Sequence, residues 1–233
     1  MPDAGQPLRG QLNADNLLDY CKAALAHCAE LQLACLSETE TLLKLGLADY
    51  RLKQLPQHYE NFITQEKLFT EAGLNKHALK QFKSAQPLFH QRCKKLAAFG
   101  IPETLEHGDF HDNNVLIKGS KICLHDFGDA SVSHPFFSLA SFMASLEKHH
   151  KLPVTSAQTQ ILKKTYLRAW KTYGRDKDLI AAAELAYQLR PFIWLLSFQR
   201  VQACREFSLY PQFNNYLLKG CQTLLNNLFQ KTS

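Results

Sequence analysis

Residues 107–129 read His-Gly-Asp-Phe-His-Asp-Asn-Asn-Val-Leu-Ile-Lys-Gly-Ser-Lys-Ile-Cys-Leu-His-Asp-Phe-Gly-Asp, and this is the one place in the 233-residue chain where polar chemistry is concentrated. Two apolar runs, residues 115–117 and 122–124, are rich in strand-favouring side chains and flank Lys-Gly-Ser-Lys. This pattern is typical of a tight β-hairpin. With Gly119-Ser120 as the turn, the expected pairs are Ile117 with Ile122 and Val115 with Leu124.

The same register brings oxygen-bearing side chains to the open end of the hairpin. It places Asn114 opposite His125 and beside Asp126, with Asp109 one short loop upstream. A small set of oxygen ligands suits Mg²⁺, which takes one or two protein oxygens and fills its other positions with water and phosphate. A further carboxylate near bound phosphate can orient an attacking hydroxyl. The arrangement therefore predicts phosphoryl transfer.

Two spacings sharpen this prediction. The interval from Asp109 to Asn114 is that of the kinase catalytic loop, H-R-D-x-x-x-x-N, and residues 126–128 match the metal-binding D-F-G. With Gly108 in place of the kinase arginine, the stretch resembles the aminoglycoside phosphotransferase family. The tail that follows adds to this resemblance through Asp129-Ala130, His134-Pro135 and Leu139-Ala140. The resemblance is strongest over residues 105–140 and implies a small-molecule kinase with a protein-kinase-like fold.

The resemblance implies a role for each matched residue. Asp109 is the expected catalytic residue, which accepts or orients the acceptor hydroxyl. Asn114 and Asp126 are the expected metal ligands, holding Mg²⁺ against the phosphates of ATP. His111 stands where protein kinases carry a phosphate-contacting lysine, which makes it a further cofactor-binding prediction. One position departs from the family: Ser138 replaces the aspartate that usually braces the catalytic loop.

The other polar side chains of the stretch have simpler expected roles. His107 is expected to be a buried hydrogen-bonding prop for the loop. Asp112 and His125 are expected to form hydrogen bonds or meet solvent rather than bind metal. Asp129 has two possible roles, helping to bind metal or capping the following turn, and the cap is favoured.

Composition limits the function classes. A hydrophobic content of 45% and a charged content of 21% are typical of a soluble globular protein. The formal net charge of +6 comes from scattered lysines and arginines that form no stripe, so nucleic-acid binding is not indicated. No acidic pocket for a polycationic substrate is visible either, which argues against an aminoglycoside as the acceptor.

Cysteine usage and hydropathy point to the cytoplasm. The seven cysteines form no C-x-x-C pair and follow no signal peptide, a pattern expected of free thiols in a reducing compartment. No apolar run approaches the roughly 20 residues that span a bilayer. The most apolar run, residues 191–198, is expected to be a buried helix, and no membrane partner is expected.

Helical periodicity covers most of the remaining chain. Helices are expected over residues 13–35, after a capping box at 37–40, from Pro56 to near Gly73, after an N-cap at Asn75, from Pro87 to Phe99, after Pro135, and over 157–173, 176–202 with an interruption at Pro191, and 212–229. The aromatic residues of the C-terminal helices are expected mainly in the core. In the family these helices wall the acceptor pocket, so the resemblance makes Glu184, Tyr187, Arg190, Trp194 and Arg205 possible substrate contacts.

These patterns predict one domain over residues 1–233 that is mainly α with a small β-hairpin. Its parts are a helical segment (1–104), the catalytic loop and metal-binding hairpin (105–130), and a helical substrate side (131–233). Residues 1–10 resemble the segment just past the hinge of the family's two lobes. On that match the chain is the large C-terminal lobe and the small ATP-binding lobe is absent, since the sequence holds neither G-x-G-x-x-G nor G-x-x-x-x-G-K-[ST].

The expected function is that of an ATP-dependent phosphotransferase lobe, incomplete as this chain, that transfers the γ-phosphoryl group to a hydroxyl of a small molecule. Weak ATP binding and little turnover are expected from residues 1–233 by themselves. One alternative is a non-catalytic pairing module, covered by a partner with the small lobe or by a second copy. Others are a truncated remnant and a metal-dependent hydrolase, although no nucleophile motif supports the hydrolase.

Overall fold

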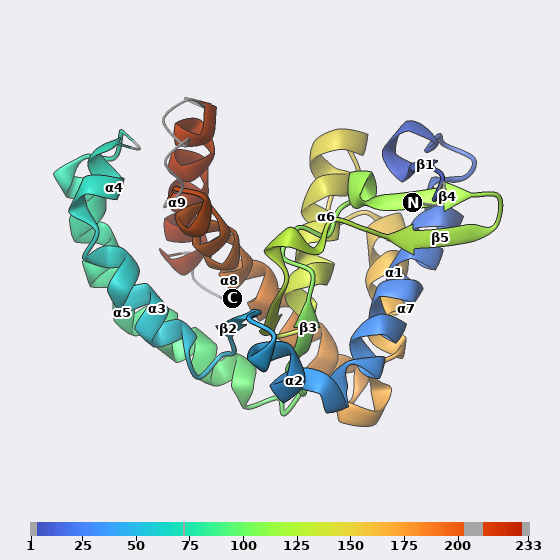
Figure 1. Cartoon of the computed structure of the whole chain (residues 1–233), viewed down its shortest axis with the longest axis horizontal. Coiled ribbons are helices and arrows are strands. Elements are labelled where there is room, and N and C mark those ends of the chain that lie inside the picture. Colours follow the sequence, from blue (N-terminus) through green and yellow to red (C-terminus); the bar gives the residue numbers. More distant parts are fainter. Residues whose placement is uncertain (1–3, 72, 203–211, 230–233) are drawn as a thin grey trace.

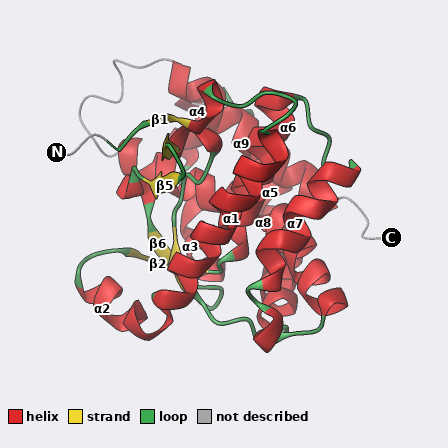
Figure 2. Cartoon of the chain, turned by 90° about the vertical axis from the view of Figure 1, so that its right-hand side faces the viewer, coloured by secondary structure: helices red, strands yellow, loops and turns green. Residues whose placement is uncertain are grey.

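The computed structural model describes residues 4–71, 73–202 and 212–229, and helices form most of it (Figure 1, Figure 2). The helices are α1 (Leu17–Ala34), α2 (Thr39–Lys44), α3 (Leu55–Ile63), α4 (Glu66–Glu71), α5 (Lys76–Ala97), α6 (Phe136–His150), α7 (Ala157–Arg168), α8 (Asp176–Gln202) and α9 (Gln212–Phe229). The strands in these ranges are β1 (Gln6–Pro7), β2 (Ala48–Tyr50), β3 (Thr104–Glu106), β4 (Val115–Lys118), β5 (Lys121–Leu124) and β6 (Ser131–Ser133). The mainly α class is therefore confirmed.

Strands β4 and β5 form the predicted hairpin. The pairing is antiparallel, with Val115 opposite Leu124 and Ile117 opposite Ile122, so the predicted register is confirmed. Gly119 in the turn has a φ of 61°, in the left-handed region that glycine enters without a steric penalty. Strand β1 adds to the outer edge of β4 and makes the sheet three-stranded, which the sequence did not predict.

A second small sheet has the strand order β2-β6-β3. Strand β6 pairs in parallel with β2 and antiparallel with β3. Each of these strands has three residues, too few to show the alternation by which strands are recognised in a sequence. The predicted class, mainly α with a small β-hairpin, therefore holds for the helices and the hairpin but lacks this second sheet. Because β3 leads into the catalytic loop and β6 follows the D-F-G turn, this sheet fixes both ends of the predicted site.

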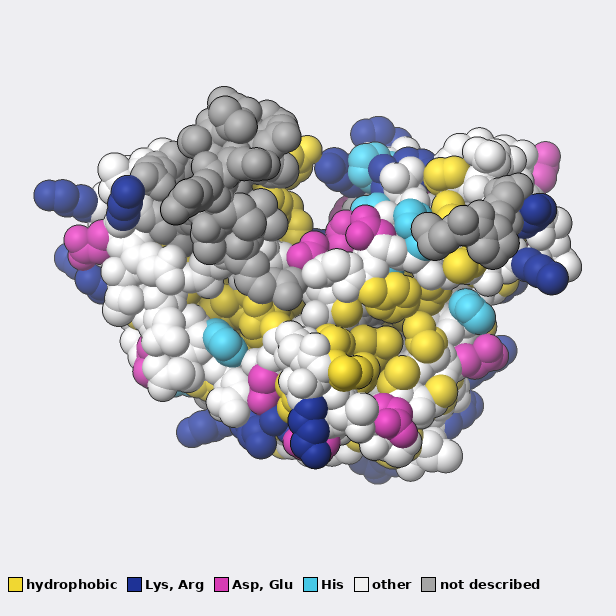
Figure 3. Space-filling view, viewed as in Figure 1, with side chains coloured by type: hydrophobic (Ala, Val, Ile, Leu, Met, Phe, Trp, Pro, Cys, Tyr) yellow, Lys and Arg dark blue, Asp and Glu magenta, His cyan; other side chains and the backbone are white. Residues whose placement is uncertain are grey.

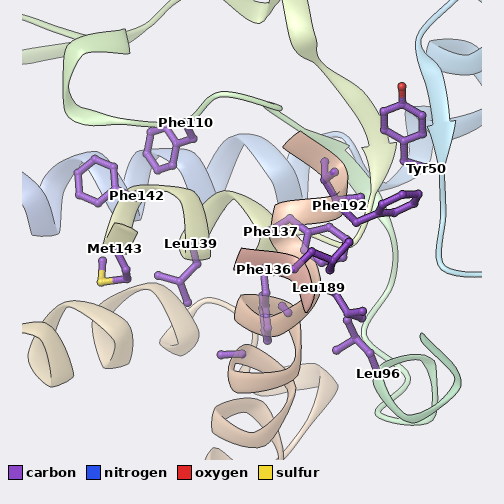
Figure 4. Packing of buried hydrophobic residues seen from close by; sticks show 14 of the residues in the cluster. Tyr50, Leu96, Phe110, Phe136, Phe137, Leu139, Phe142, Met143, Leu189 and Phe192 are labelled. Carbon is purple, nitrogen blue, oxygen red and sulfur yellow. The ribbon is translucent and has the colours of Figure 1, made fainter. Parts of the chain in front are cut away.

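Helix α6 lies at the centre of the hydrophobic core and packs against α8, which in turn packs against α9. Figure 4 shows Phe137 of α6 beside Phe192 of α8, and both side chains are fully buried. Further along α6, the ring of Phe142 stacks on that of Phe110, with the ring centres 4.8 Å apart. Phe110 directly follows Asp109 in the chain, so this stack anchors the catalytic loop to the core.

Two prolines lie inside helices that the sequence predicted to begin or break at them. Helix α5 continues through Pro87 and α8 through Pro191. Proline lacks an N–H and crowds the carbonyl one turn earlier, so each helix loses a hydrogen bond. Tertiary packing offsets this loss, because the neighbouring Phe89 and Phe192 are fully buried. The predicted restart at 87 and interruption at 191 were therefore wrong.

The predicted helix ends are confirmed in part. The side chain of Asn75 accepts a hydrogen bond from the N–H of Ala78 at 2.9 Å and caps α5 as predicted. The capping box at residues 37–40 does not form: Ser37 donates to Glu38 instead, and α2 begins without a side-chain cap. The helix predicted from Pro56 to near Gly73 is divided into α3 and α4.

Helix α8 is long and apolar enough over Asp176–Gln199 to cross a membrane by length and composition alone. This segment is longer than the apolar run noted in the sequence at residues 191–198. In the structure 56% of its apolar window is buried inside the protein, where α8 contacts α6 and α9. That burial fits the core helix predicted for its most apolar part.

Candidate active site

The two predicted motifs pack against each other around Gly108. Gly108 has a φ of 82°, and a Cβ at this position would lie 2.1 Å from the carbonyl oxygen of Asp129. The ring of His107 lies 4.4 Å from that of Phe127, and its Nε2 is 3.0 Å from the carbonyl oxygen of His125. The catalytic loop therefore crosses directly over the D-F-G turn, and only glycine fits at the crossing.

His111 orders the loop that follows Asp109. Its Nδ1 accepts hydrogen bonds from the backbone N–H groups of Asn113 and Asn114, both at 3.2 Å. A ring nitrogen that accepts carries no proton, which assigns the proton of the neutral ring to Nε2. Nε2 lies 3.2 Å from Oδ2 of Asp109. Both ring nitrogens are thus engaged within the loop, and the predicted contact of His111 with a cofactor phosphate stays a prediction.

Asp109 and Asn114 come together as predicted. The side-chain amide of Asn114 donates to the carbonyl oxygen of Asp109 at 3.0 Å and to its Oδ2 at 3.3 Å. With the amide nitrogen used in this way, the amide oxygen is the atom left for a cation. The Asp109 side chain is 38% exposed, so an acceptor hydroxyl can reach it.

Asp126 lies beside this pair along the hairpin. The N–H of His125 donates to the carbonyl oxygen of Asn114 at 3.1 Å, which places residue 126 next to Asn114. Asp126 has φ 63° and ψ 59°, a left-handed conformation that costs a non-glycine residue about 1–3 kcal/mol and is concentrated at functional sites. Its side chain is exposed, and no hydrogen bond within the described ranges occupies its carboxylate. Joint metal binding by Asn114 and Asp126 stays a prediction.

The surroundings of Asp109 favour its ionised form. Burial alone would raise the pKa of the Asp109 carboxyl, but the hydrogen bond from His111, together with the positive charge of Arg190, holds this pKa below its ordinary value. An ionised carboxylate can accept a hydrogen bond from a hydroxyl. Its low basicity suits it to orienting that hydroxyl more than to removing the proton early in the reaction.

The brace expected from an aspartate at position 138 is built from two residues. Ser138 Oγ donates to Glu106 Oε1 at 2.9 Å and accepts from the N–H of His107 at 3.3 Å. Glu106 Oε2 accepts from the N–H of Gly108 at 2.9 Å. A buried carboxylate therefore still holds the catalytic loop, but it comes from β3 instead of α6. Burial raises the pKa of Glu106 to about 7, although its bonds from Gly108 and Ser138 oppose this rise.

Asp112 has the hydrogen-bonding role that the sequence predicted. Its side chain is fully buried and accepts two hydrogen bonds from Arg9, at 2.9 and 3.0 Å. Ser145 donates to it at 2.7 Å, and His150 Nε2 lies 2.7 Å away. Burial alone would raise the pKa of Asp112, but Arg9, His150 and Ser145 hold it well below the ordinary value. Asp112 thus ties the catalytic loop to η1 (Leu8–Gly10) and α6.

A cavity of about 630 Å³ opens beside Asp109. It lies between the catalytic loop, α6, α8 and α9, and its lining includes Arg190 and Trp194, two of the predicted substrate residues. Figure 3 shows this side of the molecule hollowed, with acidic, basic and histidine side chains gathered on one wall. The cavity gives an acceptor molecule direct access to the predicted catalytic carboxylate.

The other predicted substrate residues do not line this cavity. Glu184 forms an ion pair with Lys163 at 2.8 Å. Burial, together with the negative charge of Glu147, raises the pKa of the Tyr187 hydroxyl above its ordinary value. Arg205 lies outside the described residues.

The oxygen-bearing side chains of the site suit a cation that needs few protein ligands. In the described part of the chain, no group of three or more His, Cys, Asp or Glu side chains is placed to hold a metal ion. Magnesium usually keeps several waters and is bound through one or two protein oxygens together with substrate phosphates. Asn114, which directly precedes β4, and Asp126, which follows β5, are the residues that would hold it here, at the open end of the hairpin.

Comparison with known families agrees with this geometry. The chain matches the phosphotransferase enzyme family over residues 7–179. It belongs to that family. The resemblance carried by residues 105–140 is therefore confirmed, and the family implies a phosphotransferase enzyme with a kinase-like fold that typically uses ATP. No curated protein matches the chain.

Proposed function

We propose that this phosphotransferase takes part in ATP-dependent transfer of the γ-phosphoryl group to a hydroxyl of a small molecule. The observation that carries the proposal is the contact of the Asn114 amide with the Asp109 carboxylate, at 3.3 Å, on the wall of an open cavity. A group that can orient a hydroxyl and a group that can bind a cation thus share one short loop.

Phosphoryl transfer requires mainly that the protein position the reactants and neutralise the charge of the phosphates. Each residue of the site therefore has a limited task. Asp109 accepts a hydrogen bond from the acceptor hydroxyl and aligns it. The Asn114 amide oxygen and the Asp126 carboxylate hold Mg²⁺, while His111 and the Glu106–Ser138 pair keep the loop in position. Magnesium-bound ATP supplies the phosphoryl group and neutralises charge during its transfer.

Metal-dependent nucleotide binding tests this assignment. Mn²⁺ can replace Mg²⁺, and its electron paramagnetic resonance signal gives the concentration of the free ion. Titration of the full chain with ATP in the presence of Mn²⁺ therefore measures how much metal is bound with the nucleotide. We expect Asp126→Asn to weaken nucleotide-dependent Mn²⁺ binding by at least roughly tenfold, as loss of a residue at a metal site commonly does. Asp15→Asn is the matched control, because Asp15 is an exposed aspartate outside the site. Equal binding in the wild type and Asp126→Asn would refute the assignment.

A turnover assay complements the binding measurement. ADP formation is followed with the full chain, Mg²⁺, ATP and a panel of amino alcohols, sugars and hydroxy acids. Hydroxyl-dependent ADP formation supports the proposal. Metal-independent transfer of phosphate to the same acceptors would contradict the roles given to Asn114 and Asp126.

A further inference from the structure

Positive charge dominates the walls of the cavity beside Asp109. Among the described lining residues, four are lysine or arginine, namely Arg9, Lys148, Arg190 and Lys219, and one is a carboxylate, Asp109. The charge of Arg9 is matched by Asp112 at 2.9 Å. No ion pair within the described ranges matches the other three cations. A bound cation would therefore meet repulsion from most of the wall.

Arg190 is the cation best placed to bind an anion. It is half-buried on α8, and its Nε donates to Ser141 Oγ at 2.9 Å, which fixes the plane of the guanidinium. Within the described chain no hydrogen bond reaches its two terminal nitrogens. The negative charges of Asp109 and Glu106 act on it, but neither forms an ion pair with it. A guanidinium with a free edge binds carboxylate or phosphate through two parallel hydrogen bonds.

An aromatic wall lies next to these cations. Trp194 and Phe198 meet edge to face, with ring centres 4.7 Å apart, and Phe198 stacks on Tyr216 at 6.1 Å. All three side chains line the cavity, and Tyr216 is 40% exposed. Partly exposed rings of this kind offer a surface to the apolar or flat part of a ligand, while a few polar groups fix its orientation.

We propose that this cavity binds acceptors in which the reacting hydroxyl is accompanied by a carboxylate or phosphate group, an inference that rests on the proposed function for the role of Asp109. The hydroxyl lies at Asp109, the anionic group meets Arg190 with Lys148 and Lys219 nearby, and the remainder of the acceptor packs on the Trp194 wall. Polycationic acceptors are disfavoured by the same charges.

Binding of charge-matched probes to the full chain, without nucleotide or metal, tests this proposal by calorimetry. Phenyllactate, phenylpropanediol and phenylalaninol share a phenyl ring and a hydroxyl but are anionic, neutral and cationic, respectively. Glucose 6-phosphate, glucose and glucosamine form a second series in which the anion is a phosphate. We expect the anionic member of at least one series to bind about tenfold or more tightly than its neutral analogue, and the series that shows this identifies the anion. The cationic member should bind most weakly.

Three variants test which side chains cause the tighter binding of the anionic probe. Arg190→Gln should weaken binding of the anionic probe by about 10–100-fold, the effect of losing hydrogen bonds to a charged group. Lys219→Gln removes an exposed charge of the cavity and keeps the test valid if Arg190→Gln does not fold. Lys95→Gln is the control: Lys95 is exposed on α5, outside the cavity, and its removal changes the net charge equally. Lys95→Gln should bind the probe like the wild type.

The proposal is overturned if neither anion binds, if the neutral or cationic probe binds as tightly, or if the cavity variants behave like Lys95→Gln. Displacement of the anionic probe by Mg²⁺–ATP would also overturn it, because the cations would then belong to the nucleotide site. Failure of the proposed function has a different signature, since it leaves probe binding intact while Asp126→Asn has no effect on nucleotide-dependent Mn²⁺ binding.

Discussion

Gly108 and Asp129 touch through their backbones, so closely that a single Cβ on Gly108 would lie 2.1 Å from the Asp129 carbonyl oxygen. This contact joins two motifs that are separate in the sequence. The catalytic loop brings Asp109 to it from one side, and the turn that begins at Asp126 brings its carboxylate from the other. The distance between the Asp109 and Asp126 carboxylates therefore depends on the absence of a side chain at Gly108.

Gly108→Ala should damage both stability and activity. The added methyl meets backbone that cannot rotate away, and the φ of 82° is unfavourable for alanine, so we expect the free energy of unfolding to fall by about 1–3 kcal/mol beyond the backbone strain alone. Gly119→Ala is the matched control, because Gly119 has a φ of 61° with nothing within 4 Å of its Cβ position. Urea unfolding of both variants measures the difference. Equal losses of unfolding free energy in the two variants would show that the close approach to Asp129 does not make Gly108 more sensitive to substitution than Gly119.

Asp109→Asn should abolish transfer and leave the fold intact. The asparagine amide has the size of the carboxylate but lacks the negative charge that holds and aligns the acceptor hydroxyl, so we expect kcat to fall by about 10²–10⁴-fold, the range contributed by a positioned acid–base group. The measurement is hydroxyl-dependent ADP formation, with circular dichroism as the control for folding. Unchanged turnover in this variant would remove Asp109 from the mechanism.

His111 can be tested for its two roles separately. His111→Ala removes the acceptor for two backbone N–H groups, and we expect a loss of about 0.5–2 kcal/mol in unfolding free energy, as for other N-cap deletions. In His111→Asn, the asparagine can still accept the backbone hydrogen bonds, but its contact with Asp109 is lost. In both variants the pKa of Asp109 should rise, because His111 helps to lower it. A pH profile of turnover measures this shift, and a profile identical to the wild type would contradict it.

The hairpin illustrates what local sequence can predict. Its register, from Val115 opposite Leu124 to the glycine turn, follows from alternation and turn chemistry within ten residues. The brace of the catalytic loop was not predictable in the same way. Glu106 and Ser138 lie on different elements and meet only because β3 and α6 pack together, and nothing in the local pattern marks Glu106 as buried.

The cavity shows the same limit at longer range. Arg190 and Trp194 were predicted as substrate residues from the family's use of C-terminal helices, and they line the cavity. Their neighbours Glu184 and Tyr187 were predicted on the same ground but point to other partners. Periodicity identifies the helix, but the side chains that reach a cavity depend on how α8 is rotated against α6 and α9. Short strands such as β2 are missed for a related reason, since their pairing is entirely tertiary.

The buried Glu106 should give the protein a pH-dependent stability. Its pKa rises from an ordinary 4.5 to about 7 in the folded state, so the folded protein holds this proton more tightly than the unfolded chain. The contribution of Glu106 to stability is therefore present below pH 4.5 and is lost as the pH rises to about 7, by roughly 3 kcal/mol in total. Urea unfolding between pH 4.5 and 8 measures the slope. Glu106→Gln should flatten it and the exposed Glu30→Gln should not; the same slope in both variants would contradict this assignment.

Ser138→Asp tests whether the brace has moved from α6 to β3. The substitution introduces the residue that the family usually carries, but Glu106 already occupies the partner site 2.9 Å from Ser138 Oγ. Two carboxylates in one buried site repel each other, and we expect the single variant to lose about 3–5 kcal/mol of unfolding free energy at pH 8, as for other unpaired buried charges. Glu106→Gln added to Ser138→Asp should recover most of that loss, because a single carboxylate then holds the loop from α6. A double-mutant cycle measures the coupling. If the two effects simply add, Glu106 and Ser138 do not share the brace.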